Sequence, residues 1–253
     1  MTGVQTYALP ISIATAEAAG FTIVQGGRHA ELPTENALII FADGGYLELL
    51  AARTAMARAV ARRLVRGPEW RVWQPRIDAI GRRFLPHLTR TGVCDLVLRH
   101  TGLADFAVSA QRRGLASEGP LTMARDRPDG QRLAWELLLP VTFELPFVID
   151  DSTPREWRVP QDPAVTHHAN GATGVGEVTM QVRSVAAARE HWAAWLGESP
   201  GVSATSFGFV LGVDDLRVRL AEGNPVGTVS ATLRGVRAAR ALDPVAHWGI
   251  SGG

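Results

Sequence analysis

Residues 36–50, NALIIFADGGYLELL, decide the fold of this chain. Two apolar runs, 36–41 and 46–50, flank the turn Ala-Asp-Gly-Gly, and Asp-Gly between apolar runs is among the strongest short signals of a β-hairpin. A helical pattern over residues 13–19 precedes the hairpin and ends at Gly20, a residue type that favours helix ends. The stretch therefore predicts a helix followed by antiparallel strands.

The same pattern occurs three times along the chain. The second copy has a helix at 103–113 that ends at Gly114, and the third has a helix at 186–196 that ends at Gly197. A strand-like segment precedes each of these helices, and further strands follow around the turns Arg-Pro-Asp-Gly and Gly-Val-Asp-Asp. Repeats of this length are supersecondary units. We predict an α+β protein in which repeated βαβββ modules form curved mixed sheets, with an unrelated α+β domain as the alternative.

These boundaries divide the chain into five segments. They are an aberrant N-terminal segment at 1–12, a first and incomplete module at 13–52, an Arg-rich helical insert at 53–90, a second module at 91–160, and a third module-like unit with a tail at 161–253.

The insert combines helical periodicity with many arginines. Met56, Val60 and Leu64 recur on one helical face, and Trp70 and Trp73 follow. The pattern predicts an amphipathic helix whose tryptophans anchor it to the rest of the protein. The alternative is an anion or nucleic-acid surface, in which arginines bind phosphates and tryptophans stack on bases. The formal net charge of +1 favours the first interpretation.

Composition narrows the function classes. The chain has 253 residues, of which 46% are hydrophobic and 20% charged, as in globular proteins. No apolar run reaches the roughly 20 residues of a membrane helix, so we expect a soluble, cytoplasmic protein. Cys94 is the only cysteine, which excludes an intrachain disulfide and a thiolate zinc site. The chain has no lysine, which excludes Schiff-base chemistry and a P-loop.

A set of short segments stands in an order and spacing that is specific when the segments are taken together. They are GFTIV at 20–24, GGRH at 26–29, TENAL at 34–38, Asp-Gly at 43–44, YLELL at 46–50, RPDGQRL at 127–133 with Trp135, LPFVID at 145–150 and HANGA at 168–172. From residue 13 to 236 the chain resembles the glyoxalase-like domain of the vicinal oxygen chelate superfamily, which usually has proline in place of Ala169. The resemblance implies paired βαβββ modules around a cupped cavity.

The resemblance also implies a divalent metal ion, of open identity, in that cavity. Such an ion polarises a substrate carbonyl while a carboxylate moves a proton. Its ligands would be imidazoles and carboxylates, and the candidates here are Glu48, His29 and His168.

The N-terminus departs from the superfamily pattern. Its members commonly open with a strand that carries an Asp-His pair, whereas residues 1–12 do not resemble that strand. They resemble the translated read-through of a common sequencing adapter. Either the natural protein has that strand and this sequence is a damaged copy of it, or this member of the superfamily has no metal ion.

Glu48 is the residue on which the functional prediction depends. Strand alternation puts Tyr46, Glu48 and Leu50 on one face of the strand at 46–50. A carboxylate in the middle of an apolar strand is costly to bury without a partner. Glu48 therefore either faces a polar cavity or pairs with an arginine inside the sheet, and we predict the former, with Glu48 as the catalytic residue.

Four residues are candidates for substrate binding. The Asn36 amide could hydrogen-bond a substrate, Arg125 could hold a carboxylate bidentately, Trp135 could form the floor of the cavity, and Asp150 follows the last strand of the second module. Each also has an ordinary structural alternative, such as strand termination, an exposed turn or core packing.

Two function classes remain open. The first is a metal-dependent lyase, isomerase or dioxygenase that acts on a small carbonyl or vicinal-oxygen compound. The second is a metal-free protein of the same fold that binds and sequesters small molecules. In both classes the partner is a small-molecule ligand or substrate. We expect no membrane and no nucleic-acid partner, and a homodimer remains open.

Overall fold

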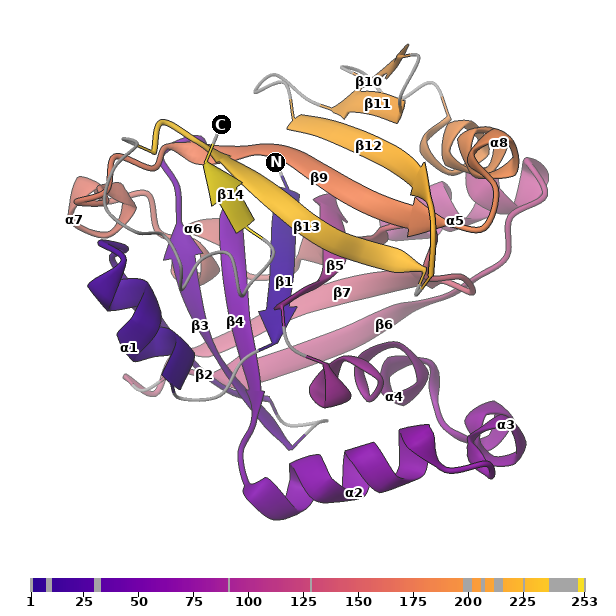
Figure 1. Ribbon diagram of the computed structural model, residues 1–253, viewed down its shortest axis with the longest axis horizontal. Helices are drawn as coiled ribbons and strands as arrows, with labels where there is room; N and C mark the ends of the chain where they lie inside the picture. Colours follow the sequence, from indigo (N-terminus) through magenta and orange to yellow (C-terminus); the bar gives the residue numbers. More distant parts are fainter. Residues whose placement is uncertain are drawn as a thin grey trace.

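Figure 1 shows the computed structural model of the chain. The structure describes residues 2–7, 11–29, 33–90, 92–127, 129–197, 202–205, 208–211, 216–224, 226–236 and 250–252. Within these ranges the predicted α+β class, with repeated βαβββ modules, curved sheets and a helical insert, is confirmed.

The three modules follow one another along the chain. The first consists of β1 (Thr2–Tyr7), α1 (Ile11–Ala18), β2 (Val24–His29), β3 (Thr34–Ile40) and β4 (Tyr46–Ala52). The second consists of β5 (Gly92–Arg99), α5 (Leu103–Arg112), β6 (Ser117–Asp126), β7 (Arg132–Pro140) and β8 (Phe147–Asp151). The third consists of β9 (Gly174–Val182), α8 (Val185–Leu196), β10 (Val202–Thr205), β11 (Gly208–Leu211) and β12 (Leu216–Glu222), and β13 (Gly227–Arg234) and β14 (Ile250–Gly252) follow it.

Each module helix ends at the glycine that the sequence predicts. Gly20, Gly114 and Gly197 have φ angles of 84°, 86° and 59°. Residues with a side chain adopt such angles at a cost, whereas glycine adopts them freely. After α1, the Phe21 amide donates to the Ala16 carbonyl and the Gly20 amide donates to the Glu17 carbonyl, so the turn that follows the helix is hydrogen-bonded.

The first two modules close a barrel in the order β1-β4-β3-β2-β6-β7-β8-β5. Each module contributes four neighbouring strands, and antiparallel pairing joins the modules at β1–β5 and at β2–β6. At the β2–β6 joint, the described residues place Arg28 opposite Asp126 and His29 opposite Arg125.

The third module forms a sheet of its own in the order β10-β11-β12-β9-β13-β14. It lies against one side of the barrel, above it in Figure 1. Its strands β9, β12, β11 and β10 repeat the neighbour order of β1, β4, β3 and β2, so the connectivity of the first module recurs. The predicted turn at 212–215 lies outside the described residues.

The barrel strands have apolar side chains on both faces because the inside and much of the outside are covered. Leu47 and Leu49 of β4 belong to an outer cluster that includes Val178 of the second sheet. Tyr46 and Leu50 belong to an inner cluster. Burial on both faces explains why these strands are nearly continuous apolar runs.

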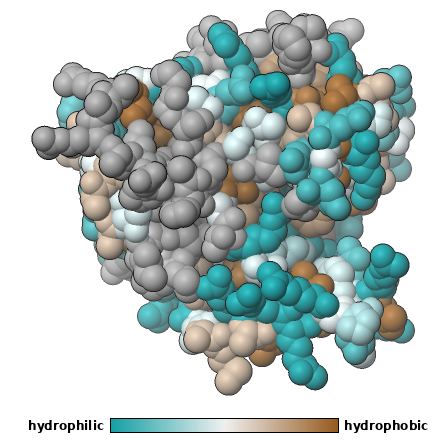
Figure 2. Space-filling model, in the orientation of Figure 1, coloured by the Kyte–Doolittle hydropathy of each residue, from teal (hydrophilic) through white to brown (hydrophobic). Residues whose placement is uncertain are grey.

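The insert between the first two modules consists of α2 (Ala55–Arg66), α3 (Trp70–Trp73), η1 (Gln74–Arg76), α4 (Ala79–Phe84) and η2 (His87–Thr89). The side chain of Thr54 accepts a hydrogen bond from the Ala57 amide and so caps α2. The predicted apolar face of α2 is largely exposed, since Met56 and Val60 are 72% and 57% exposed. Hydrophilic and hydrophobic residues lie side by side over the insert in the lower part of Figure 2.

Of the two tryptophans of the insert, Trp70 is partly buried and Trp73 is not. Trp73 is 50% exposed. A buried cluster of Arg83, Asp95 and His87 anchors the insert. Arg83 donates to both Asp95 oxygens over 2.7 and 2.6 Å, and His87 Nε2 lies 3.0 Å from Asp95 Oδ2. Arg83 also donates to the Leu145 carbonyl, so the cluster ties the insert to the second module.

β1 occupies the position of the opening strand of the first module. β1 pairs in parallel with β4 and antiparallel with β5, so the first module has all four of its barrel strands, in contrast to the incomplete module that the sequence predicted. No helix among the described residues is long and apolar enough to cross a membrane.

Candidate functional site in the barrel cavity

A cavity with an empty volume of about 610 Å³, its open mouth included, lies inside the barrel. Residues of β2, β3, β4, β6, β7 and β8 line it, together with Phe84 of α4 and Arg158 of α6 (Arg155–Arg158). Side chains from both modules and from the insert therefore meet at one space.

Glu48 lies on the inner face of β4, as strand alternation predicts, with Tyr46 and Leu50 beside it along the strand. It is only 8% exposed. The carboxylate therefore borders the cavity, and its catalytic role remains a prediction.

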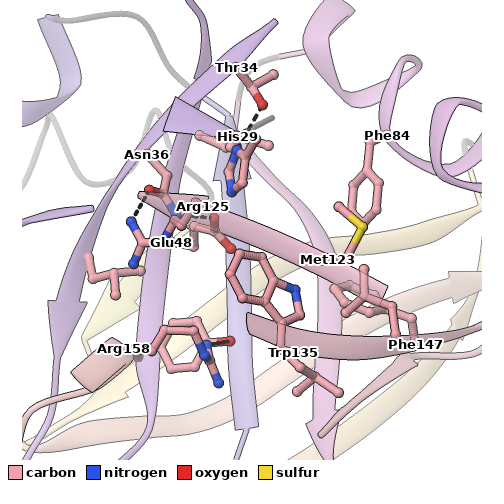
Figure 3. Close-up of a pocket in the computed structure, with 15 residues that line it drawn as sticks. His29, Thr34, Asn36, Glu48, Phe84, Met123, Arg125, Trp135, Phe147 and Arg158 are labelled. Carbon is pink, nitrogen blue, oxygen red and sulfur yellow. Dashed lines mark hydrogen bonds between the residues drawn. The ribbon is translucent and has the colours of Figure 1, made fainter. Parts of the chain in front are cut away.

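The side-chain amide of Asn36 links Glu48 to Arg125. Asn36 Nδ2 donates to Glu48 Oε1 over 2.6 Å, and Arg125 Nη1 donates to Asn36 Oδ1 over 2.8 Å. Because a guanidinium only donates and a carboxylate only accepts, these two contacts fix the orientation of the amide. The three side chains form a polar row with a carboxylate at one end and a guanidinium at the other (Figure 3).

The polar row crosses the joint between the two modules. Asn36 of β3 pairs with Gly27 of β2, and Arg125 of β6 pairs with His29 two residues further along β2. Gly26 makes room for the row, because a Cβ at this position would lie 1.9 Å from Asn36 Oδ1 and 2.5 Å from Arg125 Nη1. The GGRH segment thus supplies both the joint and the space that the row needs.

His29 and Trp135 border the cavity next to the row. His29 Nδ1 lies 2.9 Å from Thr34 Oγ1. The His29 ring stands edge-on to the Trp135 ring, with 6.3 Å between the ring centres. Trp135 is buried in the inner cluster and lines the cavity, so the predicted floor role and the core-packing alternative both describe it.

A second polar group, on another part of the cavity wall, consists of Arg158, Asp151 and Tyr46. In this group the charge of Arg158 is paired with that of Asp151. Arg158 donates to both oxygens of Asp151 over 2.5 and 2.9 Å. It also donates to the Tyr46 hydroxyl over 3.0 Å and lies over the Tyr46 ring. Burial raises the pKa of Tyr46 above its usual value of 10.0, although Arg158 acts in the opposite direction. This phenol is therefore neutral at pH 7.

The rest of the cavity wall is apolar. Phe84, Met123 and Phe147 lie beyond Trp135, away from the polar row (Figure 3). The cavity therefore has a polar side and an apolar side, a division that suits a ligand with a polar group and an apolar body.

Two predicted site residues lie outside the cavity. Asp150 Oδ2 accepts a hydrogen bond from the Gly102 amide at the start of α5. The cavity-lining residue of β8 next to it is Ile149, so Asp150 points to the other face of its strand. Asp150 is therefore not among the residues that line this cavity, and its role in substrate binding stays a prediction.

His168 also lies apart from the residues that line the cavity, and its role as a metal ligand stays a prediction. Its Nδ1 accepts from the Thr22 amide over 3.0 Å, and its Nε2 lies 3.1 Å from the Ile40 carbonyl, so both ring nitrogens are engaged. The ring packs edge-on against Phe21 and Phe41. His168 is a buried structural residue that ties the start of the third module to the first.

Tyr46, Phe84 and Arg158 are among the cavity residues that sequence analysis did not name as site residues. Tyr46 shares a strand face with Glu48, and the alternation that places Glu48 in the cavity could have placed Tyr46 there too. Phe84 and Arg158 lie on short helices outside the modules, and no local pattern shows that these helices pack against the barrel.

The described side chains do not fit a metal ion in this cavity. Among the lining residues, Glu48 and His29 are the usual metal-ligand types. No group of three or more His, Cys, Asp or Glu residues that could hold a metal ion occurs among the described residues. A protein metal site normally supplies at least three such ligands. Of the three predicted ligands, two remain in the cavity wall and His168 is engaged elsewhere.

One of the similar solved structures supports the architecture. A hypothetical protein from Staphylococcus aureus has a TM-score of 0.69 and 16% identity, and the match covers 94% of this chain and 93% of that one. A 4-hydroxymandelate synthase mutant from Streptomyces coelicolor has a TM-score of 0.48 and 12% identity, covering 97% and 73% of the two chains. A fusion protein of a xylose isomerase-like TIM barrel and 4-hydroxyphenylpyruvate dioxygenase has a TM-score of 0.43 and 12% identity, covering 97% and 38%.

At these identities the structural matches show the fold alone. No curated protein is significantly similar to this chain in sequence. The family model of the glyoxalase-like domain matches residues 11–196, which include the first module from α1 onward, the insert, the second module, and β9 and α8 of the third module. By this match, and by its barrel of paired βαβββ modules, the chain belongs to the glyoxalase-like domain family of the vicinal oxygen chelate superfamily.

Proposed function

We propose that this protein binds a small organic molecule in the barrel cavity without a metal ion. The observation that carries the proposal is the two-sided wall, in which the row of Arg125, Asn36 and Glu48 lines one side of the cavity and Phe84, Met123 and Phe147 line the other. Hydrogen bonds fix the orientation of the polar row before a ligand arrives, and such preorganisation favours binding.

A metal-dependent lyase, isomerase or dioxygenase is the second candidate. It is favoured by one observation, the presence of Glu48 and His29 in the wall of the same cavity. The described side chains do not complete a ligand set around these two residues. The proposal of metal-free binding therefore has the stronger support.

Thermal unfolding in the presence of a chelator tests the binding proposal. A panel of small aromatic and aliphatic compounds, neutral and charged, is added to protein in EDTA. A ligand at about 100 times its Kd stabilises the folded state by about 2.7 kcal/mol, which for a chain of this size raises Tm by roughly 5–10 °C. If no compound of a broad panel raises Tm, the proposal fails.

Metal analysis separates the two candidates. Protein purified without a chelator is compared with the Glu48→Ala variant by elemental analysis. The proposal expects less than about 0.1 metal ion per chain in both proteins, a threshold chosen as an order of magnitude below one occupied site. One metal ion per chain in the unaltered protein, lost in the variant, would overturn metal-free binding and favour the enzyme.

A further inference from the structure

The Arg125 guanidinium has donors directed at the cavity. Arginine carries five N–H donors. Within the part of the chain that the structure describes, the side chain of Arg125 makes one hydrogen bond, to Asn36 Oδ1, and no ion pair. The residue is only 3% exposed, yet each of its side-chain nitrogens either has a hydrogen-bond partner or remains accessible to solvent. The remaining N–H groups therefore reach the space of the cavity.

The charge of Arg125 is incompletely balanced by the protein. Burial lowers the pKa of Arg125 to about 10, against the opposing influence of Glu48, so the side chain still carries its charge at pH 7. The other cavity arginine, Arg158, is paired with Asp151. Asn36 separates Arg125 from Glu48 and keeps these two from forming a direct pair. The guanidinium is thus open on its cavity side to an anion.

The neighbouring groups restrict which anion fits. A carboxylate matches the fork of a guanidinium with two parallel hydrogen bonds. Glu48, in the same row, would repel a doubly charged group such as a phosphate more strongly than a singly charged one. Trp135 and, beyond it, Phe84, Met123 and Phe147 offer an apolar surface next to the row (Figure 3).

We infer that the ligand of the cavity is a small aromatic carboxylate, whose oxygens accept hydrogen bonds from Arg125 and whose ring packs against Trp135 and Phe147. This inference rests on the proposed function, because it names the ligand class for the same cavity. It assigns Arg125 as the specificity-determining residue and Asn36 as the residue that positions it.

Paired probes test the inference on the unaltered protein. Calorimetric titrations in EDTA use 3-phenylpropionate, 2-naphthoate and indole-3-acetate, each with its primary amide, which has nearly the same shape and no charge. We expect at least one acid to bind about tenfold or more tightly than its amide, a difference typical of one charge-assisted contact. We expect propionate, which lacks the ring, to bind at least tenfold more weakly than 3-phenylpropionate.

Two variants locate the effect. In Arg125→Gln the acid and the amide should bind within about twofold of each other, because the charge that distinguishes them is gone. In Arg132→Gln the preference should persist, because Arg132 lies on the surface with 67% of its side chain exposed. The comparison of acid and amide on the unaltered protein keeps the test valid even if Arg125→Gln does not fold.

Three results would overturn the inference, namely equal binding of acids and amides, an acid preference that survives Arg125→Gln, or no binding of any of the acids. If neutral compounds of the broader panel still raise Tm in these cases, metal-free binding stands and only the ligand class is wrong. If nothing binds at all, the proposed function fails with it.

Discussion

Arg125 of the second module donates to the side-chain oxygen of Asn36 in the first module over 2.8 Å. The contact spans the β2–β6 joint, where, among the described residues, Arg28 pairs with Asp126 and His29 with Arg125. The hydrogen bond that prepares the binding site therefore also helps to close the barrel, and stability and ligand affinity should change together at these positions.

Asn36→Leu should weaken both. Leucine has a similar volume but neither donates nor accepts, so Glu48 and Arg125 each lose a buried partner. An unsatisfied buried polar group costs about 1–3 kcal/mol, and we expect the free energy of unfolding to fall by roughly that amount, with loss of ligand binding. Chemical denaturation measures the first effect and calorimetry the second. Unchanged affinity in a folded variant would contradict the positioning role of Asn36.

Gly26→Ala should remove binding while the fold persists. The added methyl would lie 1.9 Å from Asn36 Oδ1, so the amide and the guanidinium must move. The matched control is Gly176→Ala on β9, where the new Cβ would meet the flexible Arg234 side chain at 3.0 Å, far from the cavity wall. Circular dichroism checks both folds, and titration with the best ligand should show at least a tenfold loss of affinity for Gly26→Ala alone. Equal affinity of the two variants would contradict the crowding argument.

Glu48→Gln should raise the affinity for carboxylates. Glutamine keeps the acceptor for the Asn36 amide but removes the negative charge that repels an anionic ligand held at Arg125. We expect a gain of about threefold to tenfold for 3-phenylpropionate and little change for its amide, the size expected when one partly screened like charge is removed. A loss of affinity for the acid would show that Glu48 contacts the ligand as an acceptor.

Asp95→Asn should destabilise the protein strongly. Asp95 pairs with Arg83 at 2.6 Å, and both side chains are almost fully buried, so the variant leaves an uncompensated buried cation. Breaking such a pair costs about 3–5 kcal/mol. Asp126→Asn is the control, because the Asp126–Arg132 pair is exposed and worth about 0–1 kcal/mol. Denaturant unfolding of the two variants measures the difference, and losses of equal size would refute the anchoring role of the Arg83, Asp95 and His87 cluster.

Acidification should lower stability in two stages. Burial lowers the pKa of His87 below its usual 6.5. Below about pH 6.5 this histidine is therefore protonated in the unfolded chain but still neutral in the folded chain, and the free energy of unfolding falls. Burial alone would raise the pKa of Asp95, but Arg83 and His87 outweigh it and lower the pKa from 3.8 to about 2. The stabilisation from Asp95, about 2 kcal/mol, is complete above about pH 4 and is lost as pH falls towards 2. Denaturation curves from pH 8 to about pH 2 follow both stages, and a rise in stability between about pH 7 and pH 5 would contradict the first.

The sequence by itself determined the local elements and one functional face. Asp-Gly between apolar runs specified the hairpin of β3 and β4, and glycines specified the ends of the three module helices. Both features depend on residues close together in the chain, where backbone sterics decide the outcome. The period of two along β4 likewise put Glu48 and Tyr46 on the same face, and that face lines the cavity.

Only the tertiary structure decided which side chains share the cavity. Arg125 and Asn36 are 89 positions apart, and His168 meets Ile40 across 128 positions. Strands such as β8 are apolar on both faces, so their pattern does not tell which face is inside, and Asp150 pointed outward. Local spacing sets the period of an element, whereas packing among all elements determines which elements become neighbours. This packing places Phe84 and Arg158 in the cavity wall and His168 outside it.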